Sequence, residues 1–186
     1  QNAAANYPKH RQCFSCHHQT LPMLAMVTAR DRKLATDGDL FKAQAEFTHK
    51  SFKERIEPMK EGKGIGGMSM TVAYGLWTLA LVDWKPDETT EAMVTFLLKN
   101  QKDDGRWIFQ SNRPPLEASY VTCTVLSAYY LQKFALESQR QPADAAVARA
   151  MNWLAAVKIE SQEDRVFLLW GLHLLGAKKD QIGDAR

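Results

Sequence analysis

The chain has 186 residues, of which 45% are hydrophobic, and its 24 Lys and Arg against 21 Asp and Glu give a net charge of +3. This length fits one domain, and the basic residues are too evenly spread to form the positive patch of a nucleic-acid-binding protein. No apolar run approaches the roughly 18 residues of a membrane-spanning helix. A count of 3 cysteines, which is odd, excludes a small secreted scaffold built on disulfides.

The predicted elements are all helices. Residues 1–12 are polar and without a period, and they indicate an arm. From Leu21 onward the apolar residues recur at the spacing of amphipathic helices. Pro58 marks the end of one helix, and Asp87 is a candidate N-cap of another. The predicted helices cover about residues 21–35, 39–57, 69–82, 89–100, 116–136, 143–157 and 162–175.

A weak internal repeat indicates that successive helices pair into hairpins. "YGLWTLALVDWKPDE" at 74–88 aligns with "FLLWGLHLLGAKKDQ" at 167–181, an offset of 93 residues that matches Trp77 with Trp170. This offset corresponds to two helical hairpins, each of which buries its apolar face on its neighbour. The sequence therefore predicts an all-α fold of stacked helical hairpins.

The segment "QKDDGRW", which contains Gln101, Gly105 and Trp107, resembles the Q-x₃-G-x-W repeat of the squalene–hopene cyclase and prenyltransferase superfamily. The resemblance extends over about residues 65–176 and implies a partial α/α toroid. In that family the glutamine and the tryptophan tie the end of one helix to its neighbour. A closed toroid needs more hairpins than this chain has room for, so we expect either an open arc or a piece of a longer polypeptide with further domains.

The resemblance does not extend to the catalytic residues of the family. The cyclases protonate an alkene with an acidic D-x-D-D cluster, which this sequence lacks, since Asp103 and Asp104 belong to the turn before Trp107. The protein prenyltransferases hold zinc with Asp, Cys and His. Cys123 and His173 both lie within apolar helical patterns and are expected in the core. We therefore expect a scaffold rather than an enzyme.

A second motif, C-x-x-C-H, is formed by Cys13, Cys16 and His17. It is the attachment motif of c-type haem, because two thiols at this spacing reach the two vinyl groups of one porphyrin and the next histidine binds the iron. The motif predicts one covalent haem c, with His18 near the edge of the cofactor.

Other interpretations of this motif stay open. A zinc site would use the two thiols with His17 or His18, and it would need a single further ligand from His10 or His49. A redox-active pair of the thioredoxin type needs a strand–helix–strand context, which this helical sequence lacks. The two thiols could also be purely structural.

A longer resemblance favours haem. "CFSCHHQTLPMLAM" at 13–26, followed by the toroid-type repeats and by "SQEDRVFLLWGL" at 161–172, resembles a group of exported bacterial proteins that join a C-x-x-C-H segment to prenyltransferase-type repeats. It implies a periplasmic or extracellular location, where we expect electron transfer with a redox partner protein. The start "QNAAANYPKH" lacks the features of a signal peptide, and we expect it to be a mature end left after cleavage.

The sixth position of the iron would be filled from elsewhere in the chain. If the first two predicted helices are antiparallel, residues just after the second come level with His17, which makes Met59 the leading distal candidate. His18 adjoins His17 and cannot easily reach the opposite face of the same iron. The other candidates are Met68, Met70, His49 and His10.

We therefore expect residues 1–20 to form a haem-binding arm and residues 21–186 to form a toroid-like repeat domain that is incomplete in this chain. The alternative function is a helical binding module for an apolar or peptide ligand, in which the C-x-x-C-H segment is a zinc or thiol staple. A Soret absorption band distinguishes the two functions, because only haem produces it.

Overall fold

The computed structural model describes residues 2–110, 112–114 and 116–177. This part is helical, with one isolated β-bridge between Arg113 and Glu117 and a short 3-10 turn at Glu137–Gln139, so the predicted all-α fold is confirmed. No helix within it combines the length and the apolar character needed to cross a membrane. The α-helices are α1 (Asn2–His10), α2 (Thr20–Asp31), α3 (Gly38–Lys53), α4 (Ile56–Lys60), α5 (Met68–Ala80), α6 (Glu88–Asn100), α7 (Tyr120–Phe134), α8 (Arg140–Ala156) and α9 (Gln162–Leu174).

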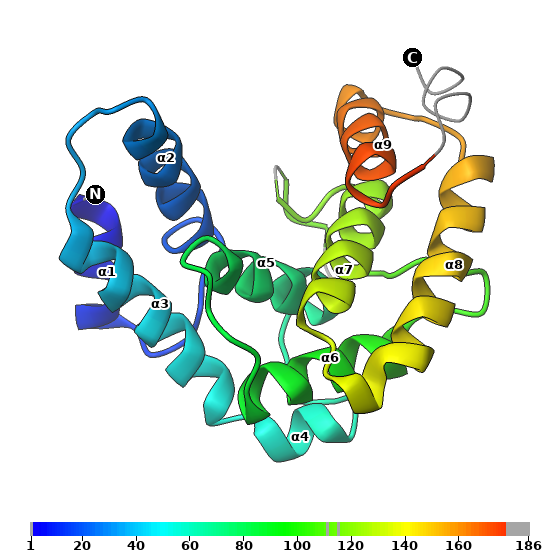
Figure 1. The fold of residues 1–186 in the computed structure, drawn as a ribbon, viewed down its shortest axis with the longest axis horizontal. Coiled ribbons are helices and arrows are strands. Elements are labelled where there is room, and N and C mark those ends of the chain that lie inside the picture. Colours follow the sequence, from blue (N-terminus) through cyan, green and yellow to red (C-terminus); the bar gives the residue numbers. More distant parts are fainter. Residues whose placement is uncertain (1, 111, 115, 178–186) are drawn as a thin grey trace.

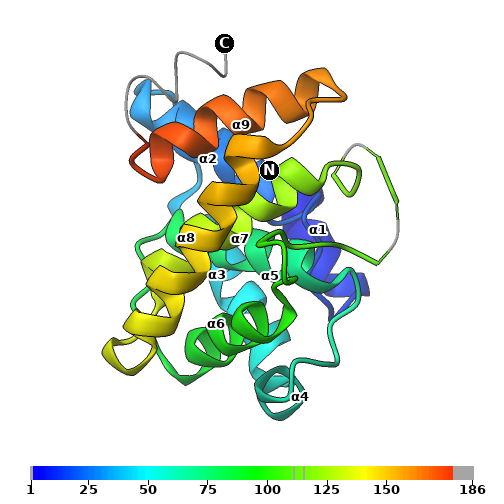
Figure 2. The same ribbon diagram turned by 90° about the vertical axis from the view of Figure 1, so that its right-hand side faces the viewer.

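The helices form two rows that curve into an open arc (Figure 1). The inner row contains α2, α5, α7 and α9, and the outer row contains α3, α4, α6 and α8. From α2 onward the chain alternates between the rows, except that α3 and α4 follow one another in the outer row, and neighbours within a row pack side by side. Figure 2 shows the outer helix α8 lying over α7 and α6. Stacked hairpins produce this alternation, so the predicted open stack matches the structure.

The inner row supplies about half of the buried hydrophobic residues. Helix α5 is buried along nearly its whole length, and two glycines let inner helices approach their neighbours closely. A Cβ on Gly75 would lie 2.4 Å from the ring of Phe52 in α3, and a Cβ on Gly171 would lie 2.3 Å from Val125 in α7. Larger side chains at these two positions would push the helices apart.

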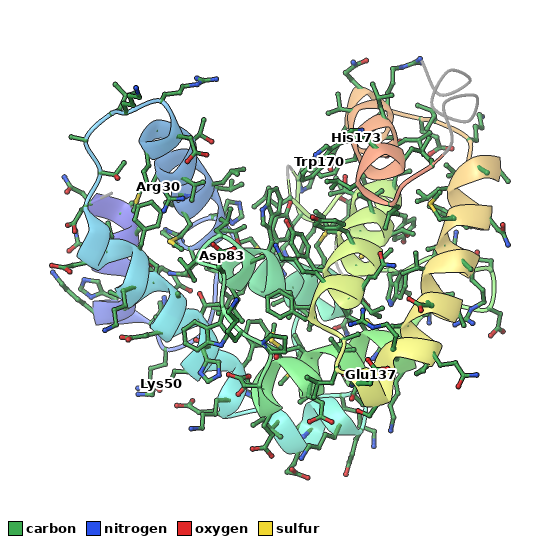
Figure 3. The ribbon with its side chains drawn as sticks, in the orientation of Figure 1. Arg30, Lys50, Asp83, Glu137, Trp170 and His173 are labelled. Atoms are coloured by element: carbon green, nitrogen blue, oxygen red, sulfur yellow. The ribbon has the colours of Figure 1, made fainter. Side chains whose placement is uncertain are left out.

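The two tryptophans matched by the internal repeat meet in the structure. The ring centroids of Trp77 in α5 and Trp170 in α9 are 5.5 Å apart, and Trp77 also stacks on Tyr130 at 6.0 Å. Figure 3 shows Trp170 and His173 on α9. His173 was predicted to lie in the core, but its side chain is exposed. The residue before it, Leu172, packs toward α7, and the next residue of a helix faces a different direction.

The Q-x₃-G-x-W segment joins three helices. The Gln101 side chain donates to the carbonyl of Ala146 in α8 over 2.8 Å, and the Trp107 indole N–H donates to the carbonyl of Leu97 in α6 over 2.7 Å. The backbone N–H of Trp107 donates to Thr124 Oγ1 in α7 over 3.1 Å. The segment therefore ties the end of α6 to both α7 and α8.

Three local predictions need correction. Residues 2–10 form α1, packed on α3, where the sequence predicted an arm without structure. The helix predicted over 39–57 is broken at residues 54–55, and Pro58 lies inside the short α4 because the first turn of a helix does not need its N–H. Helix α7 begins at Tyr120, later than predicted, because Ser119 caps it and the bridge at Arg113 and Glu117 precedes it.

Candidate functional site

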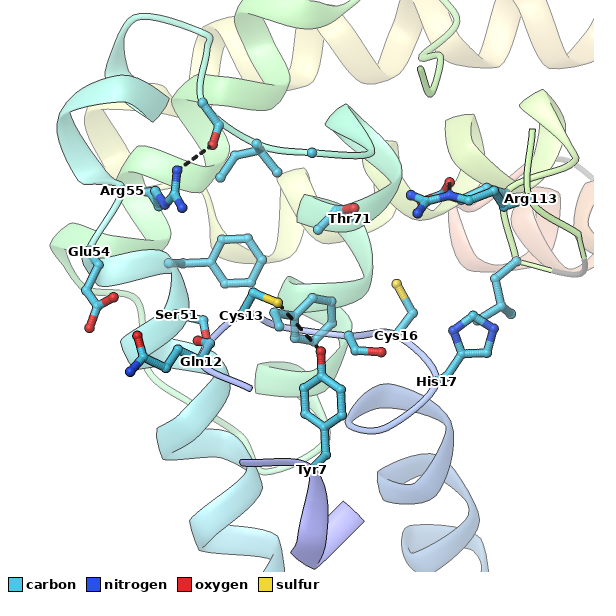
Figure 4. Close-up of a pocket in the computed structure, with 18 of the residues that line it drawn as sticks. Tyr7, Gln12, Cys13, Cys16, His17, Ser51, Glu54, Arg55, Thr71 and Arg113 are labelled. Atoms are coloured by element: carbon cyan, nitrogen blue, oxygen red, sulfur yellow. Dashed lines mark hydrogen bonds and ion pairs between the residues drawn. The ribbon is translucent and has the colours of Figure 1, made fainter. Parts of the chain in front are cut away.

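The C-x-x-C-H segment lies on a turn between α1 and α2 (Figure 4). The N–H groups of His18 and Gln19 donate to the carbonyl of Ser15 over 3.1 and 2.9 Å. In return, the Ser15 N–H donates to the Gln19 side chain over 2.8 Å. Residues 16–19 thus begin a helical turn that runs directly into α2, and this closed turn fixes the positions of Cys16 and His17.

Helix α1 packs on the C-x-x-C-H segment through the side chain of Tyr7. The Tyr7 hydroxyl lies 3.6 Å from Cys13 Sγ, and the Tyr7 ring stacks on His18 with centroids 4.4 Å apart. Burial, together with the neighbouring Cys13, raises the pKa of the Tyr7 phenol. The Gln44 side chain of α3 donates to the Ala4 carbonyl over 3.0 Å and so holds α1 in place.

Both thiols and His17 line one cavity of about 590 Å³ (Figure 4). A cofactor pocket typically encloses about 300–1,000 Å³, so the volume is suitable for a large flat ligand. The walls come from α3, from residues 64–66 after α4, from the start of α5 and from the segment before α7. The apolar lining side chains are Phe14, Phe52, Ile65, Pro114 and Leu116, and the charged ones are Glu54, Arg55, Arg113 and Glu117.

These residues fit a haem. The rings of Phe14 and Phe52, with centroids 5.4 Å apart, offer an apolar wall to a porphyrin, while the thiols and His17 are the groups that c-type haem requires. A structural zinc site needs four protein ligands, whereas haem iron takes only its axial ligands from the chain. Among the described residues, no three His, Cys, Asp or Glu side chains gather as a metal site.

The two motif thiols differ in their surroundings. Cys13 is exposed, Cys16 is partly buried, and neither forms a disulfide. Burial raises the pKa of Cys16 to about 12, so its thiol stays protonated at neutral pH. Cys123 is fully buried in the core, as predicted, and burial raises its pKa as well.

We expect Cys13 to be alkylated by iodoacetamide much faster than Cys16 when the protein is made without haem. The thiolate is the reacting form, and a pKa of about 12 leaves only about one Cys16 molecule in 10⁴ as thiolate at pH 8. Peptide mass mapping over time measures both rates, and urea-unfolded protein, in which all thiols react alike, is the control. Equal rates in the folded protein would contradict this account of Cys16.

His18, the residue after the motif, points elsewhere than His17. His17 is exposed and lines the cavity. His18 Nδ1 lies 3.1 Å from Ser15 Oγ, and the His18 ring is covered by Tyr7. His18 is not among the residues that line the cavity. In the structure it stabilises the turn and α1.

The methionines predicted as distal ligands do not line the cavity that holds the thiols. Met59 and Met70 are fully buried in the main core, and Met68 starts α5 with a φ of 52°. None of the three lines the cavity that holds Cys13 and Cys16. The break after α3 explains the position of Met59, because α4 turns away and packs against α6.

The two remaining distal candidates also lie outside the cavity. His10 is exposed at the end of α1. His49 Nε2 lies 2.8 Å from Asp87 Oδ2, and its ring stacks on Trp84 with centroids 4.7 Å apart. His49 therefore links α3 to the start of α6. The identity of the sixth ligand stays a prediction.

Replacing Asp87 with alanine should lower the free energy of unfolding by about 1–2 kcal/mol at pH 7. Asp87 caps α6 by accepting from the Thr90 N–H. Burial raises its pKa, but the hydrogen bonds from Thr90, Trp84 and His49 outweigh burial and leave the pKa below its ordinary value. A lowered carboxyl pKa contributes stability that is full above the unfolded value of about 3.9 and is lost as pH falls through the folded value.

The difference between the Asp87→Ala variant and the wild type should therefore shrink below about pH 4. Urea denaturation at pH 7 and pH 3 measures it. A difference that is as large at pH 3 as at pH 7 would contradict the assigned role of the carboxylate.

Several residues of the cavity carry no signal in the sequence. Tyr7, Arg55 and Arg113 are far from one another along the chain, and each looks like an ordinary surface residue there. Only the packing of α1, α3 and the segment before α7 brings them together around the C-x-x-C-H turn.

Comparison with models of protein families, with curated proteins and with solved structures finds no match to this chain.

Proposed function

We propose that this chain is a c-type haem protein that transfers electrons in an exported compartment, with one haem attached through Cys13 and Cys16 and His17 as the proximal ligand. The observation that carries the proposal is that all three motif residues line a single cavity, part of whose wall is formed by apolar side chains such as Phe14 and Phe52. A C-x-x-C-H sequence that occurred by chance would not be expected to lie beside a cavity of this size and lining.

The chain's own residues have distinct tasks in this proposal. Each thioether forms when a cysteine S–H adds across a vinyl double bond, so that sulfur bonds one carbon, hydrogen bonds the other, and no oxidant is consumed. Ser15 and Gln19 hold the turn that presents Cys16 and His17. Phe14 and Phe52 would limit the access of water to the porphyrin ring of the haem. When bound, the haem supplies a one-electron redox couple.

The exposure of the motif supports electron transfer rather than deep storage of a cofactor. Cys13 and His17 are both exposed, so the cofactor edge attached there would be reachable by a partner protein. The partner is a redox protein in the proposal, and the helical arc serves as a scaffold that carries the site.

A spectroelectrochemical titration of protein made with the c-type maturation machinery tests this function. The expected result is a Soret band whose reduction and reoxidation are reversible, with a slope of about 59 mV per tenfold change in ratio for one electron. A chromophore that cannot be reversibly reduced would exclude electron transfer. A colourless protein that retains one equivalent of zinc would instead favour the helical binding module with a zinc staple.

A further inference from the structure

Two arginines line the same cavity as the thiols, and both come from segments distant from the C-x-x-C-H turn. Arg55 comes from the break between α3 and α4, and Arg113 comes from the segment before α7. Figure 4 shows both arginines above Cys13 and Cys16, with Thr71 between them. The cavity is therefore chemically two-sided, with the two thiols on one side and guanidinium groups on the other.

Arg113 is held in a fixed position. Its Nε and Nη2 donate to the two carboxylate oxygens of Glu117 over 2.7 and 2.9 Å. The backbones of the same two residues exchange hydrogen bonds of 2.7 and 3.0 Å. Glu117 is nearly buried, with 9% of its side chain exposed, while Arg113 is 65% exposed. A guanidinium has five N–H donors, so this pairing leaves donors free on the outer edge of Arg113.

Arg55 carries a positive charge that is not neutralised locally. Its Nη1 donates to the Gly64 carbonyl over 3.4 Å, and no described carboxylate forms an ion pair with it. Glu54 also lines the cavity, but it is exposed and its carboxylate points away from Arg55 in Figure 4. Arg55 therefore offers an available charge at the far end of the same wall.

We propose that Arg55 and Arg113 bind the two propionate carboxylates of the haem and so fix the direction in which the cofactor enters the cavity. This inference rests on the proposed function. Vinyl groups and propionates lie on opposite sides of the porphyrin, so a ring whose vinyl side meets the thiols presents its propionates to the opposite wall. Guanidinium groups suit this task because they form charge-assisted hydrogen bonds with carboxylates.

Binding of metal-free porphyrins to the full chain made without haem tests the inference, with quenching of tryptophan fluorescence as the readout. The two probes are protoporphyrin IX and its dimethyl ester, which differ only in whether the carboxylates are free. Wild-type protein should bind the free acid at least about tenfold more tightly than the ester, since a hydrogen bond to a charged group contributes about that factor. Arg55→Ala and Arg113→Ala should each lose about tenfold in affinity for the acid and little for the ester.

Two further variants serve as controls for the effect of the arginine substitutions. Arg113→Ala leaves the Glu117 charge without this partner, so the double variant Arg113→Ala/Glu117→Gln removes both charges together. Arg30→Ala is the matched control, because Arg30 lies over Phe41 and does not line this cavity. Equal binding of both porphyrins by the wild type would overturn the inference alone. If neither porphyrin binds and maturation adds no haem, the proposed function falls with it.

Discussion

Replacing Trp107 with alanine is expected to lower the free energy of unfolding by about 3–5 kcal/mol, the range for removing a large buried aromatic side chain. Trp107 is fully buried, and its indole N–H is bonded to the Leu97 carbonyl over 2.7 Å. The variant would leave a cavity between α6 and α7 and a buried carbonyl without its donor.

Guanidinium denaturation followed by circular dichroism measures this effect. Trp107→Phe, which keeps most of the buried area but cannot donate, should lose roughly 1–2 kcal/mol. Trp153→Ala is the matched control, since Trp153 is only partly buried and should cost less than Trp107→Ala. A loss below about 1 kcal/mol for Trp107→Ala would show that the Q-x₃-G-x-W segment does not hold the helices together.

Replacing His17 with alanine is expected to reduce the yield of matured, low-spin haem protein to background. In the proposed site His17 is the proximal axial ligand of the iron. The two thiols bond to the vinyl groups and do not supply an axial ligand. The neighbouring His18→Ala variant is a close control. His18 lies outside the cavity lining, under the Tyr7 ring, so its loss should leave the Soret absorbance per polypeptide nearly unchanged.

The absorbance of the two variants, normalised to protein concentration, gives the comparison directly. Circular dichroism establishes that both remain folded. If His18→Ala loses the haem spectrum and His17→Ala keeps it, the axial assignment of the motif would be reversed. Loss in both variants would show that the turn as a whole, and not His17 itself, is needed.

Helices that bury one face could be predicted from the sequence, because their apolar residues repeat at a fixed interval. Helix α6 is an example, since both its Asp87 cap and its end at Asn100 match the prediction. Helix α1 could not be predicted, because only Ala4 in it is fully buried and its position depends on hydrogen bonds from α3. The break at residues 54–55 was also hidden, since the apolar pattern continues through it to Ile56.

The candidate site was predictable only in its local part. The spacing of Cys13, Cys16 and His17 carries its chemistry in five consecutive residues, whereas the opposite wall is assembled from distant segments. Met59 was predicted beside His17 on the assumption that one helix continues to the residues just before it. The chain instead turns after α3 into the separate helix α4, so Met59 does not come level with His17 in that way. Arg113 and Glu117, four residues apart outside any helix, pair only because a backbone bridge brings them together.

In the proposed site, Cys13 and Cys16 hold one haem covalently. The most direct test of this attachment is the intact mass of protein made with the c-type maturation machinery, measured under denaturing conditions together with the pyridine haemochrome spectrum. The account predicts a gain of one haem mass and a thioether-type spectrum in the wild type, and the bare polypeptide mass in the Cys13→Ala/Cys16→Ala variant. Bare polypeptide mass in the wild type despite active maturation would contradict the claim.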